Sequence, residues 1–245
     1  MNDLSAYIPE MIETRRYLHR IPEIAWTEFL TSELVIKRVR ELGFKTIIGK
    51  ALFNEEYAYG REEDVIEKAQ KRALSMGMDP KLLEEMQGYT GCMAIWETGR
   101  DGPVTAFRFD MDCIAVEENH DETNEAYVGG FDSTFPGLMH ACGHDGHTAM
   151  GLAFARWIKD HGDSLKGTIK LVFQPAEEGT KGASGIAESG LLDDVDYFIG
   201  GSVWTPNYTN WALLLKASFR QPRLMLALLA NPLTPALPVK KDAMP

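Results

Sequence analysis

A cluster of thiol and imidazole side chains near the middle of the chain constrains its fold most strongly. Residues 139–148 read Met-His-Ala-Cys-Gly-His-Asp-Gly-His-Thr, so that Cys142, His144 and His147 lie within six positions, just after His140. Thiolate and neutral imidazole are the ligands that zinc and similar transition metals prefer, whereas an isolated cysteine or histidine would indicate only a core or surface position. The intervening glycines allow the tight turns that such convergence needs. The segment therefore predicts a metal site, to which the rest of the fold must bring further ligands.

A second segment, 168–179, ends in two adjacent carboxylates. Its first part, Ile169–Phe173, is apolar and β-branched enough for a buried strand. Pro175 ends this strand and places Glu177 and Glu178 in the loop at its tip, where open α/β sheets carry their chemistry. One carboxylate of such a pair can bind a metal while the other takes a proton from water. An isolated pair would indicate a solvated surface, but this pair follows both a buried strand and the Cys/His cluster.

Two more carboxylates follow another predicted strand. Val104–Phe109 has the apolar pattern of a buried strand, and Asp110 and Asp112 come directly after it. Alone, the Asp-Met-Asp sequence could equally form a turn or cap a helix. Together with the other two segments, it offers a carboxylate that could bridge metals or orient a ligand.

The alternation of predicted strands and helices indicates an α/β fold. We expect helices at about 5–20, 27–42, 62–77, 80–87, 146–159 and 181–190, strands at 91–97, 103–109, 167–173 and 195–200, and loops over 115–137. Such alternation predicts a sheet with helices on both faces.

Four motifs in this order resemble the metal-dependent amidohydrolases and metallopeptidases that include aminoacylase, hippurate hydrolase and indole-acetyl-amino-acid hydrolase. The motifs are Arg-Arg-Tyr-Leu-His-Arg-Ile-Pro-Glu at 15–23, Asp-Met-Asp at 110–112, the Cys/His cluster at 140–148, and Gln-Pro-Ala-Glu-Glu-Gly at 174–179. Within this family, the chain is most similar to the p-aminobenzoyl-glutamate hydrolase subfamily, which also carries a helical insertion like residues 51–90. The resemblance covers about residues 8 to 201.

The resemblance implies a role for each of five residues. Cys142, His144 and Glu178 would be metal ligands, Glu177 would be the general base, and Asp112 would match the family's catalytic aspartate, which orients the metal site. The family uses two divalent ions, usually manganese or zinc. Thiolate favours zinc and carboxylate suits manganese, so the ligand types do not select one ion.

The resemblance also implies a fold and a reaction. The fold would be the helix-covered mixed sheet of a zinc-peptidase-like catalytic domain. The reaction would be hydrolysis of the amide bond of an N-acyl amino acid such as p-aminobenzoyl-glutamate, and the partner would be a second hydrolase subunit. We expect His140 and His147 to orient ligands or support the structure, because ligating imidazoles need such partners.

Two family positions have no match. Ser202 stands where the family places a ligand histidine after the segment 196–201, and no histidine follows His161, although the family's final ligand comes near its C-terminus. The small lid domain that pairs subunits in the family has no visible counterpart either. We therefore expect impaired hydrolysis and a capacity for one metal ion. The alternative is an inactive, truncated metal-binding remnant or a partner-binding protein.

Composition changes at the same place. All 22 glycines precede residue 202, whereas 203–245 hold six of the 12 prolines and a single acid, Asp242. We expect residues 1–201 to be a partial catalytic domain and 202–245 a non-homologous tail. The tail could be a basic, amphipathic partner-binding segment. Alternatively, the tail could be the product of a shifted reading frame. A frame shifted by one base across Leu229–Leu237 permits Gly-Lys-Pro-Ala-His-Ala-Gly-Ala, which resembles an Ala-His-Ala-Gly stretch of the family's lid. This resemblance favours a frameshift near residue 202.

Charge and hydropathy argue against two other classes of protein, those that bind nucleic acid and those that bind membranes. The net charge of −11 argues against a nucleic-acid partner. The chain has neither an apolar run of 18 residues nor a basic and apolar leader, so we expect no membrane partner and a cytoplasmic location. The three cysteines do not suggest a disulfide framework.

Overall fold

Six strands form one mixed sheet in the part of the chain that the structure describes. The computed structural model describes residues 4–200 and 213–215. The strands are β1 (Lys45–Ile47), β2 (Cys92–Glu97), β3 (Val104–Asp110), β4 (Thr168–Gln174), β5 (Tyr197–Gly200) and β6 (Leu213–Leu215). They lie in the order β1-β2-β4-β3-β5-β6. Strand β3 is parallel to β4 and β5, and all other neighbours are antiparallel.

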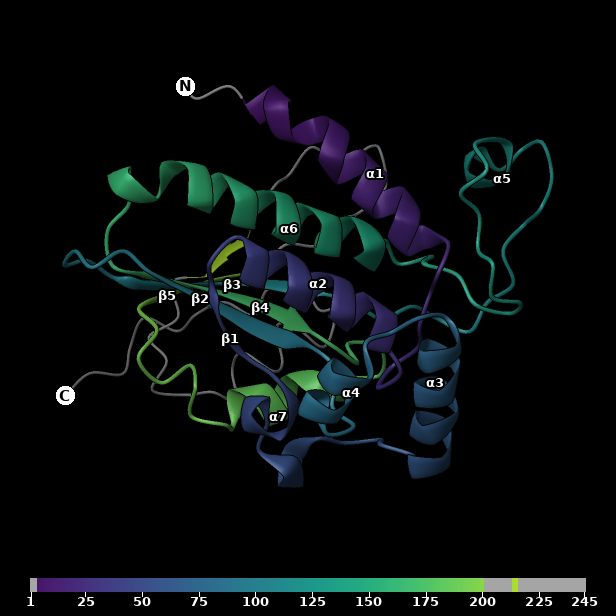
Figure 1. Cartoon of the computed structure of the whole chain (residues 1–245), viewed down its shortest axis with the longest axis horizontal. Coiled ribbons are helices and arrows are strands. Elements are labelled where there is room, and N and C mark those ends of the chain that lie inside the picture. The colour runs from purple at the N-terminus through teal and green to yellow at the C-terminus, as the bar shows by residue number, and fades with distance from the viewer. Residues whose placement is uncertain (1–3, 201–212, 216–245) are drawn as a thin grey trace, which may run out of the picture.

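Helices cover both sides of this sheet. They are α1 (Ile8–His19), α2 (Phe29–Glu41), α3 (Glu63–Ser75), α4 (Pro80–Met86), α5 (Glu125–Val128), α6 (His144–His161) and α7 (Gly182–Ala187), with 3-10 turns at Leu4–Tyr7, Gly49–Leu52, Glu55–Tyr57 and Gly162–Ser164. Helices α2 and α6 cover one face, α1 packs outside α6, and α4 and α7 lie on the opposite side (Figure 1). This arrangement confirms the expected helix-covered mixed sheet.

Strand β4 lies at the centre of the sheet, between β2 and β3. Residues Ile169–Gln174 are all buried, which explains why the segment is mostly apolar; the Lys170 ammonium reaches Asp194. Asp110 at the end of β3 is in register with Gln174 at the end of β4. Because parallel strands end at the same edge of a sheet, the Asp-Met-Asp segment and the Glu-Glu loop meet there.

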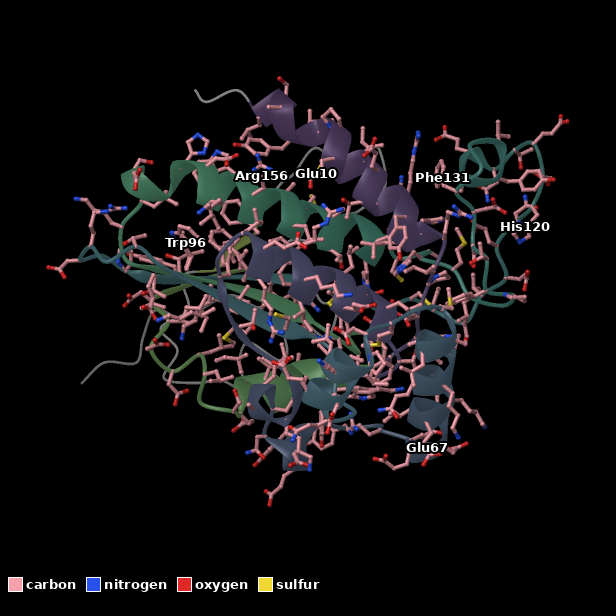
Figure 2. The ribbon with its side chains drawn as sticks, viewed as in Figure 1. Glu10, Glu67, Trp96, His120, Phe131 and Arg156 are labelled. Atoms are coloured by element: carbon pink, nitrogen blue, oxygen red, sulfur yellow. The ribbon has the colours of Figure 1, made fainter. Side chains whose placement is uncertain are left out.

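Helix α6 packs directly on this pair of strands. A β-carbon at Gly151 would lie 2.7 Å from the Phe173 ring and 2.8 Å from the Phe109 ring, so glycine is what allows the helix to approach. The C-terminal part of α6 lies over Trp96, with the Lys159 ammonium 5.6 Å from its ring (Figure 2). The N-terminal end therefore lies at the carboxyl ends of β3 and β4, where it delivers the Cys/His cluster.

The segment 51–90 contains α3 and α4, and Trp26 is one of the residues that join it to the rest of the molecule. The Trp26 indole Nε1 donates a 2.7 Å hydrogen bond to the backbone oxygen of Tyr59. The Arg61 guanidinium lies 5.1 Å from the Trp26 ring and, within the segment itself, 3.7 Å from the Tyr89 ring. These contacts fix the insertion beside the edge of the sheet that carries the site.

Of the segment 202–245, the structure describes Leu213–Leu215, which form β6 against β5. The expectations for the remainder, Ser202 included, lie outside the described residues. No helix in the described part of the chain is long and apolar enough to cross a membrane.

Candidate metal centre

The structure brings the three predicted metal ligands together. Cys142 and His144 lie at the start of α6, and Glu178 lies in the loop after β4. One donor atom from each, the Cys142 sulfur, a His144 ring nitrogen and a Glu178 carboxylate oxygen, all fall within 4.8 Å of one another. Thiolate, imidazole and carboxylate are the donor types that divalent transition metals accept, so this set fits the expected ion.

The electrostatics of Cys142 also favour a cation. Partial burial, a hydrogen bond with Glu178 and the charge of Glu177 raise the pKa of the Cys142 thiol to about 12. A thiol with this pKa is protonated near neutral pH. Because only the thiolate is a good ligand, the site gains its third donor when a cation replaces the proton.

The His144 imidazole is oriented by the chain that follows β3. Its Nδ1 lies 2.8 Å from the backbone oxygen of Asp112, which fixes Nδ1 as a donor and makes Nε2 the nitrogen on which a cation would replace a proton. Nε2 lies 3.9 Å from Glu177 and 4.0 Å from Glu178. Burial lowers the pKa of His144, but hydrogen bonding to Asp112 and the charge of Asp110 outweigh burial and raise it to about 9.

Asp112 holds the Glu-Glu loop in place. Its side chain is fully buried. One carboxylate oxygen accepts a 2.9 Å hydrogen bond from the backbone N–H of Glu177, and the other accepts a 2.9 Å bond from the N–H of Glu178. The residue therefore fixes the backbone of both predicted functional glutamates and also orients His144.

Glu177 lies beside this centre in a half-buried position. Burial and the charges of Asp110 and Asp112 raise the pKa of its carboxyl group, whereas Arg108 and His144 lower it. The Arg108 guanidinium approaches Glu177 to 3.8 Å and pairs with Asp110 at 2.5 Å. A carboxylate with a raised pKa, next to the ligand set, is suited to accept and release a proton.

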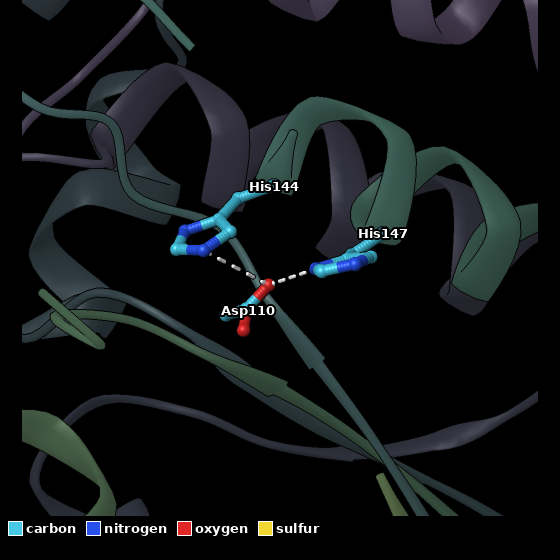
Figure 3. Close-up of side chains that lie close together, drawn as sticks. All are labelled: Asp110, His144 and His147. Carbon is cyan, nitrogen blue, oxygen red and sulfur yellow. Dashed lines mark hydrogen bonds and ion pairs between the residues drawn. The ribbon is translucent and has the colours of Figure 1, made fainter. Parts of the chain in front are cut away.

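A second, fully buried cluster adjoins the first. Asp110, His144 and His147 also have donor atoms within 4.8 Å of one another, and the Asp110 carboxylate contacts His147 Nδ1 directly (Figure 3). The two histidines stack with their ring centroids 5.5 Å apart. Burial opposes ionisation of Asp110, but Arg108 and His147 outweigh it and hold its pKa well below its usual range. The sequence pattern did not identify this Asp110–His147 pair, although two histidines three residues apart on a helix share one face.

A third buried group supports the N-terminal end of α6. His19 lies 2.8 Å from Asp145 and 3.1 Å from Glu118, and thereby connects α1, α6 and the segment 115–137. The neighbouring His140 is buried, and neither of its ring nitrogens has a hydrogen-bond partner among the described residues. Burial lowers the pKa of His140 to about 4, so its ring is neutral at physiological pH.

Comparisons with known proteins identify the family of the chain. Residues 106–215 match the model of peptidase family M20/M25/M40, and the chain belongs to the M20 peptidase family. It is 42% identical over 195 residues to a Haemophilus influenzae homolog of one subunit of p-aminobenzoyl-glutamate hydrolase, an alignment that covers 79% of this chain and 46% of that protein. It is also 42% identical over 193 residues to indole-3-acetyl-aspartic acid hydrolase of Enterobacter agglomerans, covering 78% and 44%.

A solved structure extends the similarity to the fold. The Bacillus subtilis YXEP protein, described as a dinuclear metal binding peptidase of the M20 family, aligns with a TM-score of 0.61 and 28% identity. The alignment covers 82% of this chain and 44% of that structure. The chain thus spans about half the length of the relatives that it matches.

Proposed function

We propose that this chain provides the metal centre of a hydrolase that cleaves the amide bond of N-acyl amino acids of the p-aminobenzoyl-glutamate type. The observation that carries this proposal is the convergence of Cys142, His144 and Glu178 beside Glu177. The names of the relatives support the substrate class, because both are hydrolases of an acidic amino acid whose nitrogen bears an aromatic acyl group. We also propose that the partner is a second hydrolase subunit, since one relative is named as the homolog of a single subunit of such an enzyme. We further propose that the protein is located in the cytoplasm.

In this proposal Cys142, His144 and Glu178 hold a divalent ion, zinc or manganese, and the second ion that the family uses would need ligands beyond this set. When bound, the ion would polarise the amide carbonyl and make water easier to deprotonate. Glu177 takes the proton of the attacking water and returns it to the leaving amine nitrogen as the carbon–nitrogen bond breaks. Asp112 keeps Glu177 and Glu178 in register through their backbone N–H groups.

Metal analysis and an activity assay test this proposal separately. The chain is loaded with zinc or manganese, dialysed and analysed for metal. We expect a Cys142→Ala, His144→Ala double variant to lose the metal and a His120→Ala control, in an exposed histidine, to keep it. Equal metal content in the double variant and the parent chain would rule out the site.

Release of p-aminobenzoate from p-aminobenzoyl-glutamate measures the reaction. We expect Glu177→Gln to abolish metal-dependent release without loss of metal, and Glu67→Gln on the exposed side of α3 to have no effect (Figure 2). A parent chain that binds metal but releases no product would instead support the alternative, an inactive metal-binding remnant.

The nature of the tail needs a separate measurement. We propose that residues 1–201 form a partial catalytic domain and that 202–245 arise from a shifted frame. One observation counts against a boundary at residue 202: the family match and strand β6 both continue to residue 215. Sequencing of the gene around codon 202 tests the proposal: a long open alternate frame that encodes further histidines supports it, and a closed alternate frame refutes it.

A further inference from the structure

A cavity of about 410 Å³ opens beside the metal centre. Glu178, one of the three clustered donors, forms part of its wall, and so does Cys113, the neighbour of Asp112. Apolar side chains make up most of the remainder, among them Ile24, Trp26 and Ile114. Its volume is within the range of small-molecule sites, which combine apolar walls with a few polar groups. A larger cavity of about 500 Å³, lined by Arg15, Arg16 and Phe131, contains none of the clustered donors.

The segment 51–90 supplies one wall of the cavity beside Glu178. Gly60, Glu62, Val65 and Ile66 all line it. This wall is fixed in position: Ile66 is buried, and the hydrogen bond and cation–π contact described above join the insertion to Trp26, which also lines the cavity. The insertion therefore determines the shape of a space that starts at the metal centre.

One cation lies in the wall of the same cavity. Lys181 follows the Glu-Glu loop by three residues, and its aliphatic chain covers Gly60, where a β-carbon would lie 2.8 Å from Lys181 Cδ. Within residues 4–200, no carboxylate forms an ion pair with the Lys181 ammonium. An unpaired ammonium beside apolar walls is suited to bind a ligand that carries both a carboxylate and a ring.

We infer that this cavity is the acyl subsite of the chain and that the insertion 51–90 selects an aromatic acyl group. The aromatic ring would lie between Trp26, Val65 and Ile114, and Lys181 would bind a carboxylate of the acidic amino acid. The amide between them then lies next to Glu178. This inference rests on the proposed function for the orientation of the ligand, but binding tests it without turnover.

Binding of three small ligands distinguishes the two halves of the subsite. All variants carry Glu177→Gln so that amides stay intact, and calorimetry measures Kd for N-benzoylglutamate, N-acetylglutamate and benzamide. We expect Val65→Trp, which fills the cavity, to weaken the two benzoyl ligands at least tenfold and N-acetylglutamate less than twofold. Leu74→Trp, at an exposed position of the same helix, is the matched control and should change nothing.

Substitution of Lys181 tests the part of the subsite that would bind the carboxylate. We expect Lys181→Met to weaken both glutamate ligands at least tenfold and benzamide less than twofold, while Lys71→Met on the exposed side of α3 has no effect. The inference is overturned if Val65→Trp weakens N-acetylglutamate as much as N-benzoylglutamate, if either cavity variant leaves its ligands unchanged, or if N-benzoylglutamate does not bind the parent chain. These results do not depend on hydrolysis, so a chain that binds as expected but releases no product refutes the proposed function alone.

Discussion

Replacing Asp112 by asparagine changes the support of the Glu-Glu loop with almost no change in volume. The carboxylate accepts one hydrogen bond from each of the backbone N–H groups of Glu177 and Glu178. Asparagine keeps one accepting oxygen and turns an NH₂ group toward the other N–H, so one bond is lost and one donor faces another donor. A hydrogen bond to a charged group contributes about 1.5–3 kcal/mol, and an unsatisfied buried donor costs about 1–3 kcal/mol. We expect Asp112→Asn to lower the free energy of unfolding by about 2–4 kcal/mol.

The same substitution should weaken metal binding. Because the Asp112 carboxylate holds the backbone of Glu178 and lies 3.4 Å from His144 Nδ1, we expect a loss of affinity of about 10- to 100-fold, typical of residues that orient ligands. Urea unfolding measures the first effect and a zinc titration the second, with Asp101→Asn at an exposed position as the control. A variant whose stability lies within about 0.5 kcal/mol of the parent chain, the usual range for surface substitutions, and whose zinc affinity is unchanged would refute this reasoning.

Two further predictions concern packing and pH. Gly151→Val should destabilise the fold by about 1–3 kcal/mol in thermal unfolding, because the added carbons meet the rings of Phe109 and Phe173. Gly146→Ala in the same helix places its β-carbon in open space and should be neutral or stabilising. Equal effects of the two substitutions on stability would exclude the packing argument. Burial raises the pKa of Glu23 from 4.5 to about 7, and hydrogen bonds from Thr31 oppose this rise. The contribution of Glu23 to the free energy of unfolding is therefore most favourable below pH 4.5 and is lost as the pH rises through about 7. The free energy of unfolding of the parent chain, relative to that of Glu23→Gln, should therefore fall by about 3 kcal/mol between about pH 4.5 and 7.5. If urea unfolding gives the same pH dependence for both proteins, this prediction is contradicted.

The sequence predicts the central strands and the ligand set because their signals are local. Strands β3 and β4 are mostly apolar, with Arg108 and Lys170 as interruptions, and Cys142, His144 and Glu178 lie in two of the motifs that carry the family resemblance. The short strand β1 is not detectable in this way, since its three residues are only partly buried and acquire their structure by pairing with β2. Helix α6 begins two residues earlier than expected because Gly143 adopts a left-handed conformation that turns the chain directly into the helix at His144.

Contacts that depend on register were not predictable from the sequence. The support that Asp112 gives to the Glu-Glu loop requires β3 and β4 to be parallel with Asp110 opposite Gln174, which no single segment encodes. The pairing of Asp110 with His147 depends in the same way on how α6 lies over the sheet. The four-residue helix α5 inside the expected loop region is capped by Asn124, a local signal that a search for long apolar periods does not detect.

The strand order has a consequence for synthesis on the ribosome. Both neighbours of β3, namely β4 and β5, come later in the chain, and Asp110 pairs with a residue as distant as Gln174. At about 5–20 residues per second, the nascent chain would wait roughly 3–13 s between translation of the two strands. During this time Phe107 and Phe109 lie in an apolar strand with unpaired edges on both sides, a state prone to aggregation. Nascent chains that end between residues 110 and 168 should therefore be the ones that chaperones bind most.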